Sequence, residues 1–236
     1  MQLFYNPQIS TNTKNFTFDK NESKHIIRVL RKKEGDQLFI TNGNGYLFNA
    51  ELIAANGRKC TIQIISYEKK PKEWNYTLHI AMAPTKLNDR FKWFLEKATE
   101  IGIDEITPII CENSERKMVK IERLEKILIS AMKQSLKYQL PKLNAAINFS
   151  DFIRNNVDGK KLIAHCENTT KKTIKSQLKS QNKITVLIGP EGDFSSKEIS
   201  LALHHKYIPL SLGKSRLRTE TAGVVVCNTI SVLKNE

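Results

Sequence analysis

The stretch VLIGPEGDFSSKEI, residues 186–199, decides how the second half of this chain is read. The apolar run 186–188 predicts the end of a buried strand, and a turn containing glycine and proline then leads into a helix. Ser195 and Glu198 have the spacing of a capping box, which satisfies the first free N–H groups of that helix. A strand–turn–helix corner needs such residues for backbone reasons alone, so a structural role and a ligand-binding role both stay open here.

The turn lacks the signature of a phosphate site. A phosphate loop places Lys and Ser or Thr directly after its second glycine, and a dinucleotide loop needs three spaced glycines. Glu191 and Asp193 instead bring negative charge to the place where a phosphate would lie. An adenosine that carries a cationic sulfonium therefore suits this acidic, backbone-lined loop better than a phosphate does.

Strands and helices alternate from residue 76 to the end of the chain. Apolar runs predict strands at 77–83, 105–111, 160–166, 183–189 and 207–212. Helical periodicity and end signals predict helices at 90–102, 120–139, 195–206 and 219–233. This alternation indicates an α/β fold with a mostly parallel sheet covered by helices on both faces. In such sheets, ligands bind at the carboxyl ends of the strands.

The first 70 or so residues have a different pattern, which is all-β. Three extended runs lie within 37–70, and the Asn-Gly pairs in 42–45 and 56–57 predict the turns between them. A short amphipathic helix is expected over 22–36. Short strands that curl on themselves indicate a small barrel, and the charged, proline-containing stretch 68–74 reads as a linker. We therefore predict a first domain over 1–72 and a second over 73–236.

Composition limits the functional classes. The 236 residues carry a formal net charge of +14 with a pI near 9.6, which favours a polyanionic partner such as nucleic acid. The alternative is a lysine-rich surface that binds nothing. No apolar run has transmembrane length and no signal peptide is recognisable, so we expect no membrane partner. The four cysteines and five histidines are scattered, which predicts a reducing cytoplasm and no metal site.

A second polar strand end, PLSLGKSRLRTETAG, covers residues 209–223. Gly213 lets the backbone turn, and Thr219 is placed to cap the last helix. Glu220 falls in the first turn, where a negative charge suits the positive end of the helix. Arg216 and Arg218 are either solvated arginines beside a capped helix or part of a polar loop that faces a ligand.

These motifs resemble a known family. LIGPEGDFSSKEI (187–199) and LSLGKSRLRTETAG (210–223) are similar to the two long motifs of the RsmE family, which are 16S ribosomal RNA uracil-N3 methyltransferases of the SPOUT class. HIIRVLR (25–31), DRFKWFLEKATEIG (89–102) and ERLEKILISAMKQSLKYQLPKL (122–143) resemble further segments of that family. The resemblance covers nearly the whole chain, with the motifs in the same order.

The resemblance implies a fold and an activity that periodicity does not show. Residues 1–72 would form a PUA-like β-barrel that binds RNA. Residues 73–236 would form a SPOUT methyltransferase domain with a C-terminal trefoil knot, a rare exception to unknotted topology. The cofactor would be S-adenosyl-L-methionine, and the protein would be a cytoplasmic homodimer. Its partner would be 16S ribosomal RNA, in the small ribosomal subunit.

The resemblance also implies the site residues. Arg218 is the candidate catalytic cation, and Glu220 is a candidate general base whose competing role is to stabilise the helix end. His25, Arg28 and Arg31 are candidates for RNA binding, although a solvated helix face explains the arginines equally well. The cofactor-binding residues would be His165, Cys166, Gly189, Pro190, Glu191, Gly192, Leu212, Gly213, Leu217, Thr219 and Thr221.

Three positions depart from the family pattern. Asp193 stands where a second glycine is usual, Ser215 stands where an arginine is usual with Arg216 one place later, and Lys137 replaces a common arginine. Arginine and lysine differ in geometry, because only arginine binds a phosphate with two parallel hydrogen bonds. The alternative functions are a SPOUT methyltransferase acting on another RNA and a non-enzymatic RNA-binding protein of ribosome assembly.

Overall fold

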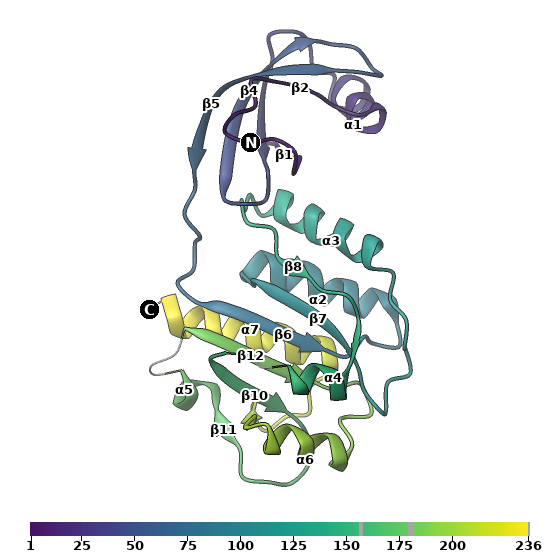
Figure 1. Ribbon diagram of the computed structural model, residues 1–236, viewed down its shortest axis with the longest axis vertical. Coiled ribbons are helices and arrows are strands. Elements are labelled where there is room, and N and C mark those ends of the chain that lie inside the picture. Colours follow the sequence, from purple (N-terminus) through teal and green to yellow (C-terminus); the bar gives the residue numbers. More distant parts are fainter. Residues whose placement is uncertain (156–157, 179–181, 236) are drawn as a thin grey trace. The chain divides into compact units, whose positions relative to one another are not determined.

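The computed structural model describes residues 1–155, 158–178 and 182–235. Strands dominate the first part of the chain, and strands and helices then alternate, as Figure 1 shows along the colour gradient. Within the described ranges, no helix has the length and apolar character that crossing a membrane requires.

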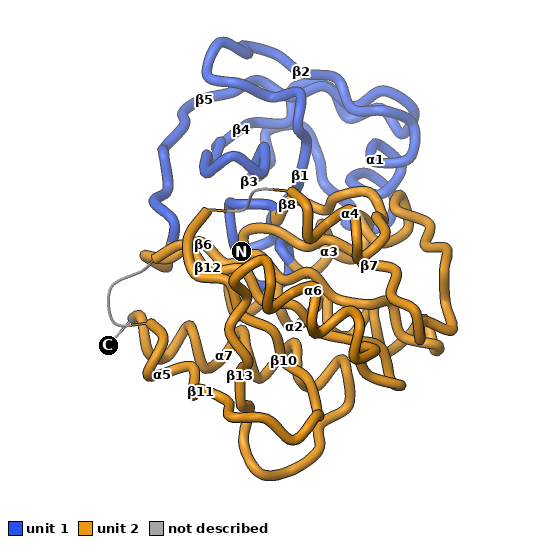
Figure 2. Tube along the Cα trace, turned by 60° about the horizontal axis from the view of Figure 1, so that its bottom comes forward, with its two compact units in different colours: residues 1–72, 132–140 blue, residues 73–131, 141–236 orange. Residues whose placement is uncertain are grey.

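The chain divides into two compact units, which are coloured separately in Figure 2. Unit 1 comprises Met1–Lys72 and Met132–Leu140, and unit 2 comprises Glu73–Ala131 and Pro141–Glu236. The sequence-based division had placed the whole of 132–140 in the second domain. Each unit has its own apolar core, so each is described separately.

Unit 1 is built on a five-stranded sheet. Its order is β1-β3-β4-β5-β2, with β1 Leu3–Tyr5, β2 Asn15–Thr17, β3 Gln37–Thr41, β4 Tyr46–Ala54 and β5 Thr61–Lys69. The pair β1 and β3 is parallel and the other neighbours are antiparallel. The three strands predicted within 37–70 are confirmed, while the short strands β1 and β2 were not predicted.

The core of unit 1 follows the alternation of its strands. Phe48, Ala50 and Leu52 of β4 are fully buried, as expected for every second residue on one face of a strand. The turn between β3 and β4 passes through Gly43 and Gly45, with φ values of 76° and 82°. These are left-handed conformations that glycine adopts without steric cost.

The segment Met132–Leu140 joins unit 1 by pairing with this turn. The Gly45 N–H donates to the Tyr138 carbonyl at 2.8 Å, and the Leu140 N–H donates to the Gly43 carbonyl at 2.9 Å. Lys137 lies in the same segment and is only 7% exposed. Sequence reasoning missed this pairing because its partners lie about a hundred residues apart and the segment has no strand periodicity.

The helix expected over 22–36 is shorter and partly of another type. α1 spans Lys20–Lys24 and begins after Asp19, whose carboxylate accepts from two backbone N–H groups. A π-helical turn, η1 His25–Val29, follows directly. Arg31 then has a φ of 55°. A left-handed residue ends a right-handed helix, so the helical prediction beyond this point was wrong.

Helix α3 also ends before its predicted boundary. It spans Ile121–Gln134, whereas 120–139 was expected. Leu136 has a φ of 54°, and the Lys137 N–H donates to the Met132 carbonyl at 3.0 Å. The left-handed conformation at Leu136 closes the helix and lets the chain turn toward the strands of unit 1.

Unit 2 contains an eight-stranded sheet in which every described pairing is parallel. The order is β11-β13-β10-β12-β6-β7-β8, with β9 also paired to β7. The strands are β6 Thr77–Met82, β7 Glu105–Ile110, β8 Lys142–Leu143, β9 Ile147–Asn148, β10 Lys160–Ala164, β11 Lys172–Thr173, β12 Lys183–Ile188 and β13 Ile208–Ser211. The mostly parallel α/β sheet is confirmed.

Helices cover both faces of this sheet (Figure 1). They are α2 Asn88–Ile101, α4 Phe149–Arg154, α5 Ile174–Gln177, α6 Ser196–His204 and α7 Thr219–Asn235. Helices α4 and α6 share an apolar cluster with Leu187 of β12. On the other face α7 contacts β6 and β12, and α2 packs against α7. Gly223 permits this packing, since a Cβ atom there would lie 2.5 Å from the Phe94 ring.

The strand order positions the site. Strand β10 lies between β12 and β13, so chain segments that are distant in sequence become neighbours. Ala164, the last residue of β10, is in register with Ile188 of β12 and with Leu210 of β13. The loops that follow these three strands therefore leave the sheet at one edge.

Candidate active site

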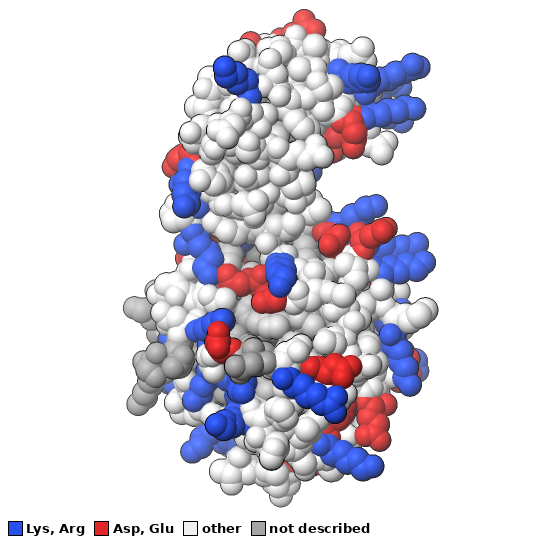
Figure 3. Space-filling model, in the orientation of Figure 1, with Lys and Arg blue, Asp and Glu red and all other residues white. Residues whose placement is uncertain are grey.

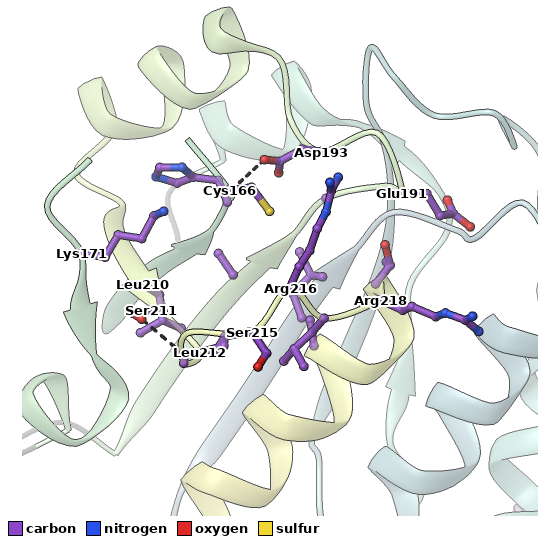
Figure 4. A pocket seen from close by; sticks show the side chains of 18 of the residues that line it. Cys166, Lys171, Glu191, Asp193, Leu210, Ser211, Leu212, Ser215, Arg216 and Arg218 are labelled. Atoms are coloured by element: carbon purple, nitrogen blue, oxygen red, sulfur yellow. Dashed lines mark hydrogen bonds between the residues drawn. The ribbon is translucent and has the colours of Figure 1, made fainter. Parts of the chain in front are cut away.

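A cavity of about 760 Å³ opens at the carboxyl ends of β10, β12 and β13. Its size lies within the range of small-molecule sites. It is lined by Ala164, His165, Cys166, Lys171, Ile188, Gly189, Pro190, Glu191, Asp193, Leu210, Ser211, Leu212, Gly213, Lys214, Ser215, Arg216, Leu217, Arg218, Thr219 and Ala222. Figure 4 shows this pocket from close by.

The loop after β12 forms one wall and is fixed from outside the pocket. The Glu191 carboxylate accepts from the Lys86 N–H at 2.9 Å through Oε1, while Oε2 is buried without a partner in the described part of the chain. Asn113 donates to the carbonyls of Gly192 and Asp193 at 3.3 and 3.2 Å. These bonds hold the loop in one conformation, which favours a preformed site.

Asp193 connects two walls of the pocket. Its φ of 64° is left-handed, a conformation that aspartate tolerates better than most residues. One carboxylate oxygen accepts from the Cys166 N–H at 2.6 Å, and the other accepts from the Phe194 N–H at 2.9 Å. The carboxylate thus joins the loop after β12 to the end of β10, and Figure 4 shows the first of these bonds.

His165 and Cys166 line the pocket at the end of β10. His165 is 7% exposed, and neither ring nitrogen has a hydrogen-bond partner among the described residues. Burial, together with the charge of Lys171, lowers the pKa of His165. Burial and then the charge of Asp193 raise the pKa of the Cys166 thiol. Both side chains are therefore neutral near pH 7, and His165 presents unsatisfied polar atoms.

The loop after β13 supplies the cationic side of the pocket. Gly213 turns the chain with a φ of 121°, and its N–H donates to the Ser211 hydroxyl at 3.4 Å. Arg216 and Arg218 are both exposed. In Figure 4 the Arg216 side chain extends across the pocket toward Asp193, whereas Arg218 points out to the side.

Glu220 lies at the start of α7 and is 6% exposed. Its Oε1 atom is 3.7 Å from the Arg90 Nε atom, and its Oε2 atom is buried without a partner in the described ranges. It does not line the pocket. Glu220 lies in the first turn of α7 and is paired with Arg90 of α2. This favours a role in stabilising the start of the helix over a role as general base.

The structure gathers most of the predicted cofactor residues around one pocket. His165, Cys166, Gly189, Pro190, Glu191, Leu212, Gly213, Leu217 and Thr219 line it. Gly192 and Thr221 lie outside this lining. A Cβ atom at Gly192 would meet Asn113 at 3.2 Å, so this glycine faces the supporting segment and not the pocket.

Sequence reasoning assigned no site role to Lys171, Lys214 or Ser215, and it left the roles of Asp193 and Arg216 open. The signal available for all of them was a polar residue within a few positions of a strand end. The Lys171 ammonium donates to the Glu167 carbonyl at 2.6 Å, which also holds the loop after β10.

The RNA-binding candidates lie in unit 1. His25 and Arg28 belong to η1, and Arg31 follows it; both arginines are exposed and His25 is half-buried. In the same segment Lys20, Lys24 and Lys33 are also exposed. Figure 3 shows Lys and Arg side chains projecting from the side of this unit that carries α1. Such clustering is the electrostatic footprint of a phosphate-binding surface.

Comparison with known families identifies both units. The RNA methyltransferase domain family matches residues 72–231, and the RNA methyltransferase PUA domain family matches residues 18–65. A relative named ribosomal RNA small subunit methyltransferase E, from Buchnera aphidicola, is 33% identical over 92% of this chain and 88% of its own. The chain belongs to the RsmE family. The family resemblance of the two loop motifs is thereby confirmed.

Solved structures of the RsmE type have the same fold. A probable rRNA methyltransferase from Porphyromonas gingivalis is 40% identical and superposes with a TM-score of 0.92, covering 99% of this chain and 98% of its own. A structure described as a methyltransferase from Legionella pneumophila, with S-adenosylmethionine bound, is 29% identical with a TM-score of 0.88. It covers 98% of this chain and 96% of its own.

Proposed function

We propose that this protein is a methyltransferase that uses S-adenosylmethionine to methylate N3 of a uridine in 16S ribosomal RNA. The observation that carries the proposal is the cavity at the ends of β10, β12 and β13, in a chain of the RsmE family. The bound cofactor of the Legionella relative and the name of the Buchnera relative support the same activity.

The residues of the pocket fit this cofactor. Buried polar atoms in proteins are nearly always hydrogen-bonded, and the ring nitrogens of His165, which lines the pocket, have no partner among the described residues. Adenosine offers hydroxyl groups and ring nitrogens that complement them. Leu212 and Leu217 provide apolar walls for the base. Gly189, Pro190, Gly213 and the remaining predicted lining residues would hold the rest of the adenosyl group.

Catalysis is mainly a matter of alignment and charge. When bound, S-adenosylmethionine supplies a methyl group already activated by its cationic sulfur. Uracil N3 carries a proton and ionises roughly two pH units above neutrality, a cost of about 3 kcal/mol. We assign Arg218 the role of stabilising the uracil anion, because it lines the pocket, is exposed, and its guanidinium has no hydrogen bond or ion pair with another described residue that would keep it from an incoming base. We assign Glu220 the role of stabilising the N-terminal end of α7.

RNA binding belongs to unit 1 in this proposal. The match to an RNA methyltransferase PUA domain and the exposed cations of 20–33 support it. Arg28, Arg31 and His25 would contact phosphates and position the strand. The target uridine must leave its stack to reach a pocket of this kind. We propose 1–72 as the RNA-binding domain and 73–236 as the catalytic domain.

We further propose a trefoil knot, a homodimer and a cytoplasmic location in contact with the small ribosomal subunit. The insertion of β10 between β12 and β13 supports a knotted path for the last third of the chain. The apolar helix α7, on which Val232 is 48% exposed, supports an additional contact with a second subunit.

A transfer assay with separated RNA classes tests this function. Purified protein is incubated with tritiated S-adenosylmethionine and with 16S ribosomal RNA, assembled small subunits, 23S ribosomal RNA or transfer RNA, all from cells lacking the gene. We expect label in 16S RNA, either free or within the subunit. Label confined to transfer RNA would show that transfer RNA, and not 16S ribosomal RNA, is the substrate. Cofactor binding without methyl transfer to any RNA would contradict the enzymatic assignment.

A further inference from the structure

Two side chains of opposite charge face one mouth of the pocket. Asp193 comes from the loop after β12 and Arg216 from the loop after β13, and both line the cavity. Figure 4 shows Arg216 reaching across the opening toward Asp193. Both charges act on the Cys166 thiol: burial and then the charge of Asp193 raise its pKa, and the charge of Arg216 lowers it. Both side chains therefore lie close to the wall that carries Cys166.

The Asp193 carboxylate is fixed but still able to accept. Its two bonds to the N–H groups of Cys166 and Phe194 hold both oxygens in place. A carboxylate has about four acceptor positions, so each oxygen retains capacity for one more donor. A ligand ammonium suits this acceptor, because hydrogen bonds between charged groups are roughly twice as strong as those between neutral groups.

Arg216 has its full donor capacity available. It is exposed, and within the described ranges its guanidinium makes no hydrogen bond or ion pair. A guanidinium binds a carboxylate through two parallel hydrogen bonds. Two other charged residues of the lining already have partners, because Lys171 donates to the Glu167 carbonyl and Glu191 accepts from the Lys86 N–H. Lys214 and Arg218 also line the pocket and are exposed, and Arg218 points out to the side in Figure 4.

An α-amino acid group carries an ammonium and a carboxylate on one carbon atom. We propose that Asp193 and Arg216 together bind this zwitterionic tail of the cofactor, with Asp193 on the ammonium and Arg216 on the carboxylate. The proposal rests on the proposed function, and it assigns the mouth of the pocket to the tail and its interior to the adenosyl group. Asp193 and Arg216 then act as binding residues that set specificity for a ligand with an amino acid end.

Calorimetry with three ligands tests the assignment on the intact protein. S-Adenosylmethionine and S-adenosylhomocysteine both have the tail, but only the first has a cationic sulfur; 5′-methylthioadenosine has neither. The variants are Asp193→Asn, which loses the charge and one of the two acceptor oxygens, and Arg216→Gln, which removes the guanidinium but no hydrogen bond among the described residues. Asp151→Asn and Arg154→Gln are the matched controls, because these exposed residues form an ion pair on α4 outside the pocket.

We expect each pocket variant to weaken both tailed ligands roughly tenfold, equivalent to about 1.4 kcal/mol, and to leave 5′-methylthioadenosine unchanged. Equal weakening of all three ligands would mean that the residues only shape the pocket, and would overturn the proposal. Weakening of S-adenosylmethionine alone would assign Asp193 to the sulfonium, which also overturns it, as would unchanged binding. Failure of the wild-type protein to bind any of the three would instead contradict the proposed function.

Discussion

Removal of the Arg218 side chain separates catalysis from cofactor binding. In the Arg218→Ala protein, the cation that we assign to the uracil anion is gone, while the residues that surround the adenosyl group remain. Two unit charges 4 Å apart interact by about 1 kcal/mol in water and by about 4 kcal/mol at the dielectric typical of a protein surface. Arg218 is exposed in the absence of RNA, so the lower part of this range applies until RNA covers it.

A loss of about 1.4 kcal/mol of transition-state stabilisation slows the chemical step tenfold. The anion forms only as the reaction proceeds, so we expect methylation of RNA at least about tenfold slower with nearly normal affinity for S-adenosylmethionine. The assay is single-turnover methylation at saturating cofactor, run beside a binding titration. Arg154→Ala, an exposed arginine outside the pocket, is the matched control.

Two results would refute this reasoning. An unchanged single-turnover rate in Arg218→Ala would mean that the arginine is only solvated. Loss of cofactor affinity in a protein that remains folded by circular dichroism would mean that Arg218 shapes the pocket and does not act on the uracil. Arg218→Lys adds a further comparison, because retention of a positive charge should preserve part of the rate if charge is what matters.

Three further predictions follow from packing, titration and assembly. Gly223→Ala should lower the free energy of unfolding by about 1–3 kcal/mol, measured by urea denaturation, because its Cβ atom would lie 2.5 Å from the Phe94 ring; an unchanged midpoint would contradict the close packing of α2 and α7. Burial lowers the pKa of His79, so the stability that its neutral form contributes is fully present above pH 6.5 and is lost as the pH falls through the lowered pKa. The His79→Gln variant should therefore lose less stability than the wild type below pH 6.5, and an equally steep decrease would contradict this. Sedimentation should give twice the mass of the 27.0 kDa chain, and an active monomer at micromolar concentration would contradict the homodimer.

Features determined by the local backbone were predictable from the sequence. The turn after β12 and its capping box at Ser195 and Glu198 are present as the sequence indicated. The parallel order of the sheet follows from the alternation of strands and helices, and it brings the loops at 164–166, 189–193 and 212–219 together. Strand ends with glycine and polar residues were therefore sufficient to find most of the pocket.

Features that depend on long-range contacts or unusual dihedral angles were not predictable. Nothing in the local pattern marks Arg31 and Leu136 as left-handed, yet these residues end their helices. The bond from the Cys166 N–H to Asp193 joins residues 27 positions apart and exists only once β10 and β12 are paired. The left-handed φ of Asp193 also gives a physical reason why glycine suits the same position.

The most direct test of the account is nucleoside mass spectrometry of 16S ribosomal RNA from three strains. The first lacks the gene, the second carries the wild-type gene on a plasmid, and the third carries the Arg218→Ala gene. The account predicts that N3-methyluridine is absent from the first, fully restored in the second and reduced in the third, with other modified nucleosides unchanged. Normal N3-methyluridine in 16S RNA of the deletion strain would contradict the proposed function.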